Sequence, residues 1–98
     1  MTRIEKAINL FNKGLAQLLS KDYANAASSF GEATSKNSNL AVAYYGAAVA
    51  AARSGKADLV VSNLTSAVKA DPTLKDKALT DLEFSKYAAT QPFRDALK

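Results

Sequence analysis

The residues of this chain that could carry chemistry form three short patterns. Ser66 and Lys69 have the Ser-x-x-Lys spacing of serine acyl-transfer enzymes, in which a lysine one helical turn away helps to deprotonate the nucleophile. Asp81 and Glu83 are the closest pair of carboxylates in the last third of the chain. The dipeptide Gly-Lys at 55–56 is a fragment of a phosphate-binding loop. Complete versions of these patterns would predict acyl transfer, acid–base catalysis or nucleotide binding.

None of the three patterns is complete. The Ser-x-x-Lys pair lacks the companion S-D-N and K-T-G elements, and the Gly-Lys pair lacks the upstream glycine and the following hydroxyl. Carboxylates two residues apart on a helix point to different sides and do not converge on a substrate. The chain has no histidine and no cysteine, which removes the commonest general base, the thiolate nucleophile and the usual soft metal ligands. We therefore predict that the protein is not an enzyme and holds no metal and no cofactor.

An internal repeat of 34 residues is the most informative pattern. Shifting the chain by that length places Ala7, Ala26, Phe30 and Ala33 on Ala41, Val60, Leu64 and Ala67. A hairpin of two helices this long cannot cover its own apolar side, so copies stack and share a core. We expect one domain over residues 1–98, with a first repeat at about 7–40, a second at about 41–74 and a capping or degenerate third unit at 75–98.

Helical periodicity and capping residues predict five main helices and a short C-terminal one. Thr2 and Glu5 fit a capping box that opens a first helix ending near residue 20. Further helices are predicted at about 23–33, 40–53 and 57–70. Asp71 and Pro72 predict the start of a fifth helix that continues to about Tyr87, before a break at 90–92 and a short final helix. No strand pattern competes, so the predicted fold class is all-α.

The charge pattern argues against two classes of partner. Thirteen Lys and Arg against nine Asp and Glu give a net charge of +4, but the cations are scattered and form no basic block. We therefore expect no nucleic-acid binding, which usually requires clustered cations. No apolar run approaches the ~20 residues that span a bilayer, and no secretory signal opens the chain. A complete chain of this kind would be cytoplasmic, whereas the compartment of an excised domain stays open.

The spacing of the small and aromatic residues resembles the tetratricopeptide repeat (TPR) family. The positions that carry the resemblance are Gly14, Ala26, Phe30 and Ala33 in the first copy, and Tyr44, Gly55, Ala67 and Asp71-Pro72 in the second. The resemblance implies a right-handed superhelix of antiparallel helix hairpins that binds a polypeptide on its concave side. The chain departs from the family pattern at Lys21, Ser38 and Val60, where the repeat usually has Gly, Pro and Ala.

The resemblance also places an apolar stripe on the concave side, which the first, third and fifth helices would form. On the first helix the stripe comprises Ile8, Phe11, Leu15, Leu18 and Leu19, and Glu83 would extend the surface on the fifth. We expect the partner-binding residues to be Phe11, Leu15, Leu18, Val42, Tyr45, Val49, Arg53, Leu79 and Lys86.

Three interpretations of this stripe are open, and solvent exposure distinguishes them. A rotated first helix would make the stripe part of the core, which is the usual role of apolar residues at helical spacing. Alternatively, the stripe lines a groove for a partner helix or an extended peptide. The chain's own tail around Phe93 and Leu97 could also fill that groove. We predict a protein–protein interaction module, with a structural or oligomerisation segment, covered by neighbouring repeats or a second copy, as the alternative function.

Overall fold

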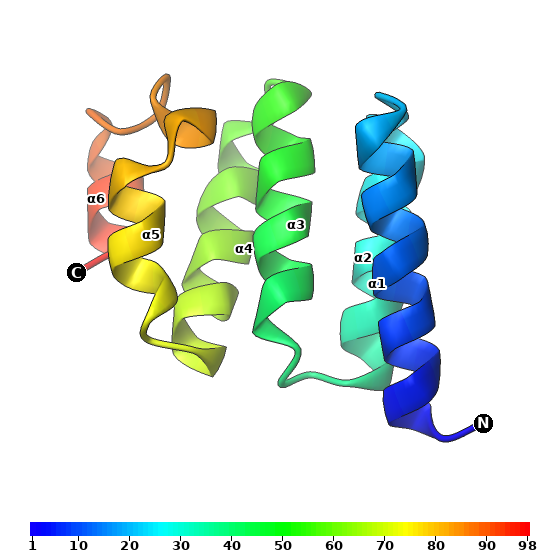
Figure 1. The fold of residues 1–98 in the computed structure, drawn as a ribbon. Coiled ribbons are helices and arrows are strands. Elements are labelled where there is room, and N and C mark those ends of the chain that lie inside the picture. The colour runs from blue at the N-terminus through cyan, green and yellow to red at the C-terminus, as the bar shows by residue number, and fades with distance from the viewer.

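The computed structural model describes all 98 residues and is entirely helical (Figure 1). In chain order the elements are α1 (Arg3–Leu19), α2 (Tyr23–Lys36), α3 (Ala41–Arg53), α4 (Ala57–Ala70), α5 (Leu74–Thr80), the 3₁₀ turn η1 (Leu82–Phe84) and α6 (Gln91–Ala96). The all-α fold predicted from the sequence is confirmed. None of the helices is long and apolar enough to cross a membrane.

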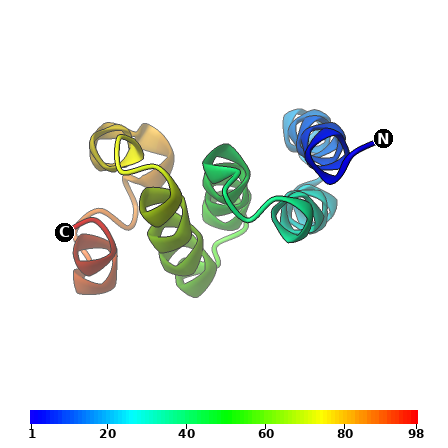
Figure 2. The same cartoon turned by 90° about the horizontal axis from the view of Figure 1, so that it is seen from below.

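The helices form two layers, with α1, α3 and α5 in one and α2, α4 and α6 in the other (Figure 2). α1 packs antiparallel on α2, α3 packs antiparallel on α4, and α2 joins the two hairpins through its contact with α3. α1 and α5 stand forward on either side of α3, so the face that these three helices share is concave (Figure 2). The sense in which the hairpins coil around one another stays a prediction.

The backbone repeats itself at the spacing of 34 residues. Lys21 and Gly55, which end the turns after α1 and α3, both adopt left-handed backbone conformations, with φ of 64° and 72°. Asn37 and Asp71, which follow α2 and α4, both have φ of −144°, with ψ of 97° and 96°. Lys21 therefore adopts a backbone conformation that suits glycine, the residue that the second copy has at the equivalent position, Gly55.

The core lies between the two layers and consists mainly of alanine and a few large side chains. All eight residues that define the internal repeat are buried, and Phe30, Val60 and Leu64 are fully so. Phe30 of α2 lies between Gly14 of α1 and Gly46 of α3, at positions where a Cβ atom would approach its ring to 2.7 Å. The absence of side chains at these two glycines allows three helices to meet around one aromatic ring.

The prediction of a fifth helix that continues to Tyr87 is wrong. α5 begins at Leu74, two residues after Pro72, and ends at Thr80 because Asp81 is extended, with ψ of 121°. The Asp81 carboxylate then accepts a hydrogen bond from the backbone N–H of Glu83 at 3.0 Å and so caps the new turn, η1. This break turns Phe84 inward, where its ring packs 5.6 Å from that of Tyr45.

The C-terminal helix packs on α4 and closes the end of the core. Phe93 and Leu97 are buried there, and the Phe93 ring lies 6.0 Å from that of Phe84. Both residues therefore lie in the core, Phe93 within the helix that packs against α4 and Leu97 directly after it. The interpretation in which the tail fills the concave side is wrong.

Candidate interaction groove

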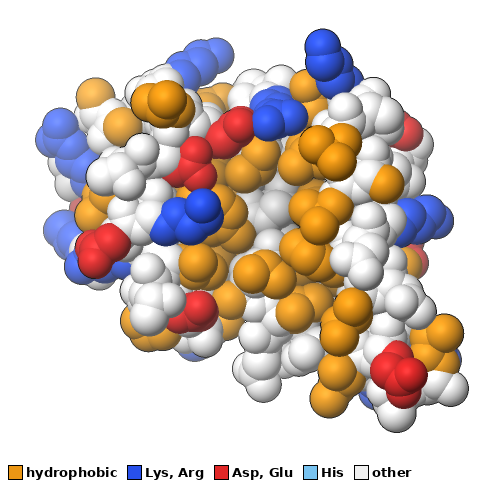
Figure 3. Space-filling model, viewed as in Figure 1, with side chains coloured by type: hydrophobic (Ala, Val, Ile, Leu, Met, Phe, Trp, Pro, Cys, Tyr) orange, Lys and Arg blue, Asp and Glu red, His pale blue; other side chains and the backbone are white.

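The concave side holds a hollow of about 320 Å³ that we call the concave groove. Its lining comes from the three helices of one layer and from the turn after α5. The lining residues are Phe11, Leu15, Leu18, Val42, Tyr45, Gly46, Val49, Leu74, Lys77, Asp81 and Glu83. Seen from this side, apolar side chains run along α1 and α3, whereas charged side chains gather toward α5 (Figure 3).

One wall of the groove comes from α1. This helix also carries an apolar ridge, which we define as Ile4, Ile8, Leu15 and Leu19 and which meets the groove at Leu15. Their exposed fractions are 60%, 46%, 36% and 82%. Their spacing places them along one side of the helix over about 22 Å. The prediction that α1 begins with a capping box is confirmed, because Thr2 and Glu5 each accept a hydrogen bond from the other's backbone N–H. A capped four-turn helix therefore presents the ridge to solvent.

Solvent exposure divides the stripe between the two remaining interpretations. Leu18 is only 9% exposed and belongs to the core, and Phe11 is partly buried, with its ring 5.7 Å from that of Phe30. Ile8, Leu15 and Leu19, in contrast, have no helix covering them, and Val42 of α3 is 44% exposed opposite them. The inner edge of the stripe is therefore core, and its outer edge is uncovered apolar surface.

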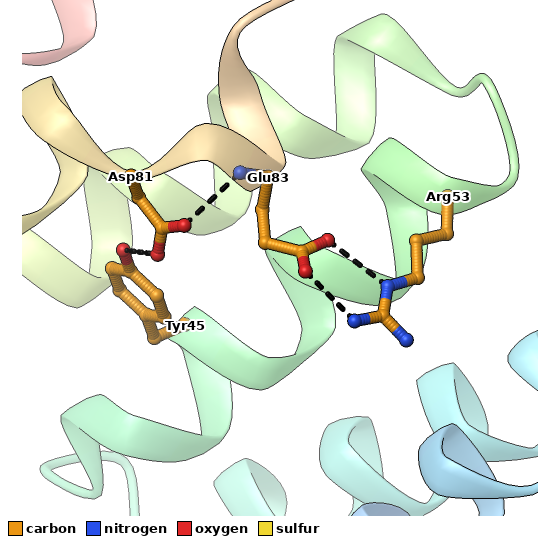
Figure 4. A network of polar contacts seen from close by, with 4 residues as sticks. All are labelled: Tyr45, Arg53, Asp81 and Glu83. Atoms are coloured by element: carbon orange, nitrogen blue, oxygen red, sulfur yellow. Dashed lines mark hydrogen bonds and ion pairs between the residues drawn. The ribbon is translucent and has the colours of Figure 1, made fainter.

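The opposite wall is a polar network that ties η1 to α3 (Figure 4). The Tyr45 hydroxyl donates to one oxygen of Asp81 at 2.6 Å, and the other oxygen of Asp81 accepts from the Glu83 N–H. Arg53 donates to both carboxylate oxygens of Glu83, at 2.9 and 2.7 Å. The Tyr45 hydroxyl and both carboxylates are therefore engaged within the fold.

The network also shifts the ionisation of its members. Burial, followed by the hydrogen bond to Asp81, raises the pKa of Tyr45 well above its usual value. The hydrogen bonds from Arg53 lower the pKa of Glu83. Both shifts favour the protonation states that hold the network together, a neutral tyrosine and an ionised glutamate, at neutral pH.

Lys77 of α5 is the one charged residue of the groove lining whose charged group makes neither a hydrogen bond nor an ion pair within the fold. Its Nζ lies 5.4 Å from the centre of the Tyr45 ring, a cation–π distance, and the side chain is exposed. The ion pairs of the protein are Arg53–Glu83 and Lys98–Asp95. The groove therefore offers a single unpaired positive charge beside an apolar surface.

The structure brings most of the expected partner-binding residues together. Phe11, Leu15, Leu18, Val42, Tyr45 and Val49 line the concave groove. Arg53 lies beside it, bound to Glu83 of the lining. Leu79 is half-exposed on α5 but outside the lining, and Lys86 follows the helix break, with its Nζ 5.8 Å from the Tyr87 ring.

The sequence interpretation missed several lining residues. Leu74, Lys77 and Asp81 recur every three or four residues, a spacing that places them on one side of a helix. Gly46 was missed as a lining residue because a glycine carries no side-chain signal.

The other candidate chemical residues lie elsewhere or are engaged. Ser66 and Lys69 line a separate polar hollow with Ser38, Asn39 and Tyr44, and no hydrogen bond joins the serine to the lysine. No cluster of three acidic side chains is arranged to hold a metal ion. The concave groove is thus the site in which apolar surface, a hollow and an unpaired charge coincide.

In comparisons with known proteins, no family model matches the chain, and no curated protein or solved structure is significantly similar to it.

Proposed function

We propose that this protein is a non-catalytic interaction module that binds a polypeptide partner in the concave groove. The observation that carries the proposal is the uncovered apolar ridge on α1, which continues into the hollow through Leu15. Contiguous apolar surface beside polar residues is typical of protein-binding sites. The resemblance to tetratricopeptide repeats supports the same assignment, because that family binds polypeptides on the corresponding side.

Stacking of further repeats against α1 is a weaker explanation of the ridge. The side of α1 that carries Asn9, Asn12 and Lys13 is polar and exposed. A neighbouring repeat packed on that side would bury these polar groups at a cost and would leave the ridge uncovered. A partner bound in the groove covers Leu15 and can extend along the rest of the ridge.

The proposal is tested with a pair of matched variants. Leu15→Glu places a charge in the groove, whereas Leu59→Glu makes the same change at an exposed leucine of α4, outside the groove. Random peptides displayed on phage are selected against the wild-type protein, and the enriched peptides are then titrated against both variants.

We expect enriched peptides to bind wild type and Leu59→Glu alike and to lose at least about tenfold in affinity for Leu15→Glu. Selected peptides that are indifferent to Leu15→Glu would place binding elsewhere and contradict the proposal. Light scattering over a concentration series tests the second function, because a dimer that dissociates in Leu15→Glu would show a second copy covering the ridge.

A further inference from the structure

The α1 and α3 sides of the groove offer almost no free hydrogen-bonding group to a bound backbone. The lining side chains of α1 and α3 are apolar except for Tyr45, whose hydroxyl already donates to Asp81. The oxygens of Asp81 and Glu83 already accept hydrogen bonds from within the fold. Only the Lys77 ammonium remains free to donate to a partner.

This deficit separates the two kinds of polypeptide that could bind. An extended peptide carries one N–H and one C=O at nearly every residue, and each group that loses water without a new partner weakens binding. A helix satisfies these groups within its own backbone and presents only side chains. The apolar walls of the groove therefore favour a helix over an extended segment.

The dimensions of the ridge agree with a helical occupant. Its members span about 22 Å, which is the length of about 15 helical residues. Such a helix presents apolar side chains at i, i+3 or i+4, i+7 and i+11 along one side, and these can interdigitate with the ridge. Val42 and Leu74 on the far side of the hollow would contact the same apolar side of that helix.

The unengaged cation of the groove and the net charge of the whole chain indicate the polar side of the occupant. Lys77 is unpaired, and the whole chain carries a net charge of +4. A partner with acidic residues would pair with Lys77 and would be attracted over longer range, whereas a second copy of this chain would be repelled.

We infer that the occupant of the concave groove is an amphipathic, acidic α-helix of about four turns, with its apolar side on the α1 ridge and a carboxylate near Lys77. This inference rests on the proposed function and specifies the partner. An extended peptide and a second copy of the chain are the alternative occupants, and each gives a different experimental result.

The probes are two displayed libraries of 18-residue peptides with matched amino-acid randomisation. One has apolar positions at helical spacing on an alanine-rich background, with Glu or Lys allowed at the polar positions. The other has the same randomised positions and a proline at every fourth residue, which prevents helix formation. Peptides from both libraries are selected for binding to the wild-type protein. Those that also bind Leu15→Glu are then removed.

We expect Leu15-dependent binders from the helical library, enriched in Glu, that gain helical circular dichroism on binding. Lys77→Ala should weaken them about fivefold, and the control Lys69→Ala on α4 should not. Leu15-dependent binders from the proline library, or helical binders enriched in Lys, would overturn this inference and leave the proposed function standing. If neither library yields a Leu15-dependent binder, both this inference and the proposed function are overturned. If the wild-type protein forms a dimer that Leu15→Glu dissociates, the occupant of the groove is a second copy and not an acidic helix.

Discussion

The closest packing in the core joins the ring of Phe30 to a glycine on each neighbouring helix. A Cβ atom added at Gly14 would lie 2.7 Å from the Cδ1 and Cε1 atoms of the ring, and one added at Gly46 would lie 2.7 Å from Cζ. The ring is fully buried, so it cannot swing into solvent to make room. We therefore predict that Gly14→Ala and Gly46→Ala each destabilise the fold.

The magnitude follows from two opposing effects. Replacing a glycine inside a helix with alanine stabilises the helix by about 1 kcal/mol. Forcing a methyl group into a packed core costs about 1–3 kcal/mol, and the upper half of this range applies because a rigid ring is confined from both sides. The expected net loss in the free energy of unfolding is about 1–2 kcal/mol, which lowers the melting temperature of a domain this size by about 5–15 °C.

Gly31 provides the matched control, because it lies on the same helix as Phe30 but is exposed, with no atom within 4 Å of an added Cβ. Gly31→Ala retains only the gain in helix propensity and should stabilise the protein by about 0.5–1 kcal/mol. Urea unfolding followed by circular dichroism measures all three variants. A Gly14→Ala protein as stable as Gly31→Ala would show that the ring does not approach α1 so closely and would contradict the prediction. Adding Phe30→Leu to Gly14→Ala should recover part of the loss if the two residues are coupled.

Three further substitutions test the turns and the polar wall. Lys21→Gly should raise the free energy of unfolding by about 0.5–1 kcal/mol in urea titration, because glycine adopts the left-handed conformation at this position without strain. Asp81→Ala should lower it by about 2 kcal/mol, because the substitution removes both the acceptor of the Tyr45 hydroxyl and the cap of η1; a neutral result would mean that neither bond stabilises the fold. The pKa of Glu83 is lowered in the folded state, so its pairing with Arg53 stabilises the protein above the unfolded-state pKa and is lost as the pH falls below it. Between about pH 5 and about pH 3, the free energy of unfolding of wild type should therefore fall more than that of Glu83→Gln, with an extra loss of less than about 1 kcal/mol. Parallel pH profiles of the two proteins would contradict a stabilising role of the Arg53–Glu83 pair.

The first four helices could be predicted from the sequence because their signals are local. The capping box of α1 involves residues three apart, and the ends of α3 and α4 follow from residues within one turn of each end. The internal repeat supplies a second, independent prediction of the same elements, because each turn in one copy has its equivalent in the other. The local helix signals and the internal repeat predict the same helices, and such agreement makes a prediction from sequence reliable.

The region after α5 could not be predicted because non-local contacts fix it. Helical spacing from Leu74 to Tyr87 is as regular as in the other helices, but Asp81 ends α5 by bonding to the hydroxyl of Tyr45, 36 residues away. Phe84 is then buried by the rings of Tyr45 and Phe93. No window of the sequence that is one helix long contains these partners.

The exposure of the apolar ridge follows from how α1 is rotated, and the contact between Gly14 and Phe30 sets that rotation. With Gly14 turned toward α2, Leu18 points into the core and Leu15, three residues earlier, points into the groove. Periodicity predicts that both leucines lie on one apolar stripe, but it cannot say which edge of the stripe is covered. Apolar area that stays in water contributes nothing to folding, so the stabilisation available from burying Ile4, Ile8 and Leu19 is realised only when another chain covers them. The fold would also form with polar residues at the ridge positions. The apolar ridge is therefore stronger support for a binding function than the helical fold is.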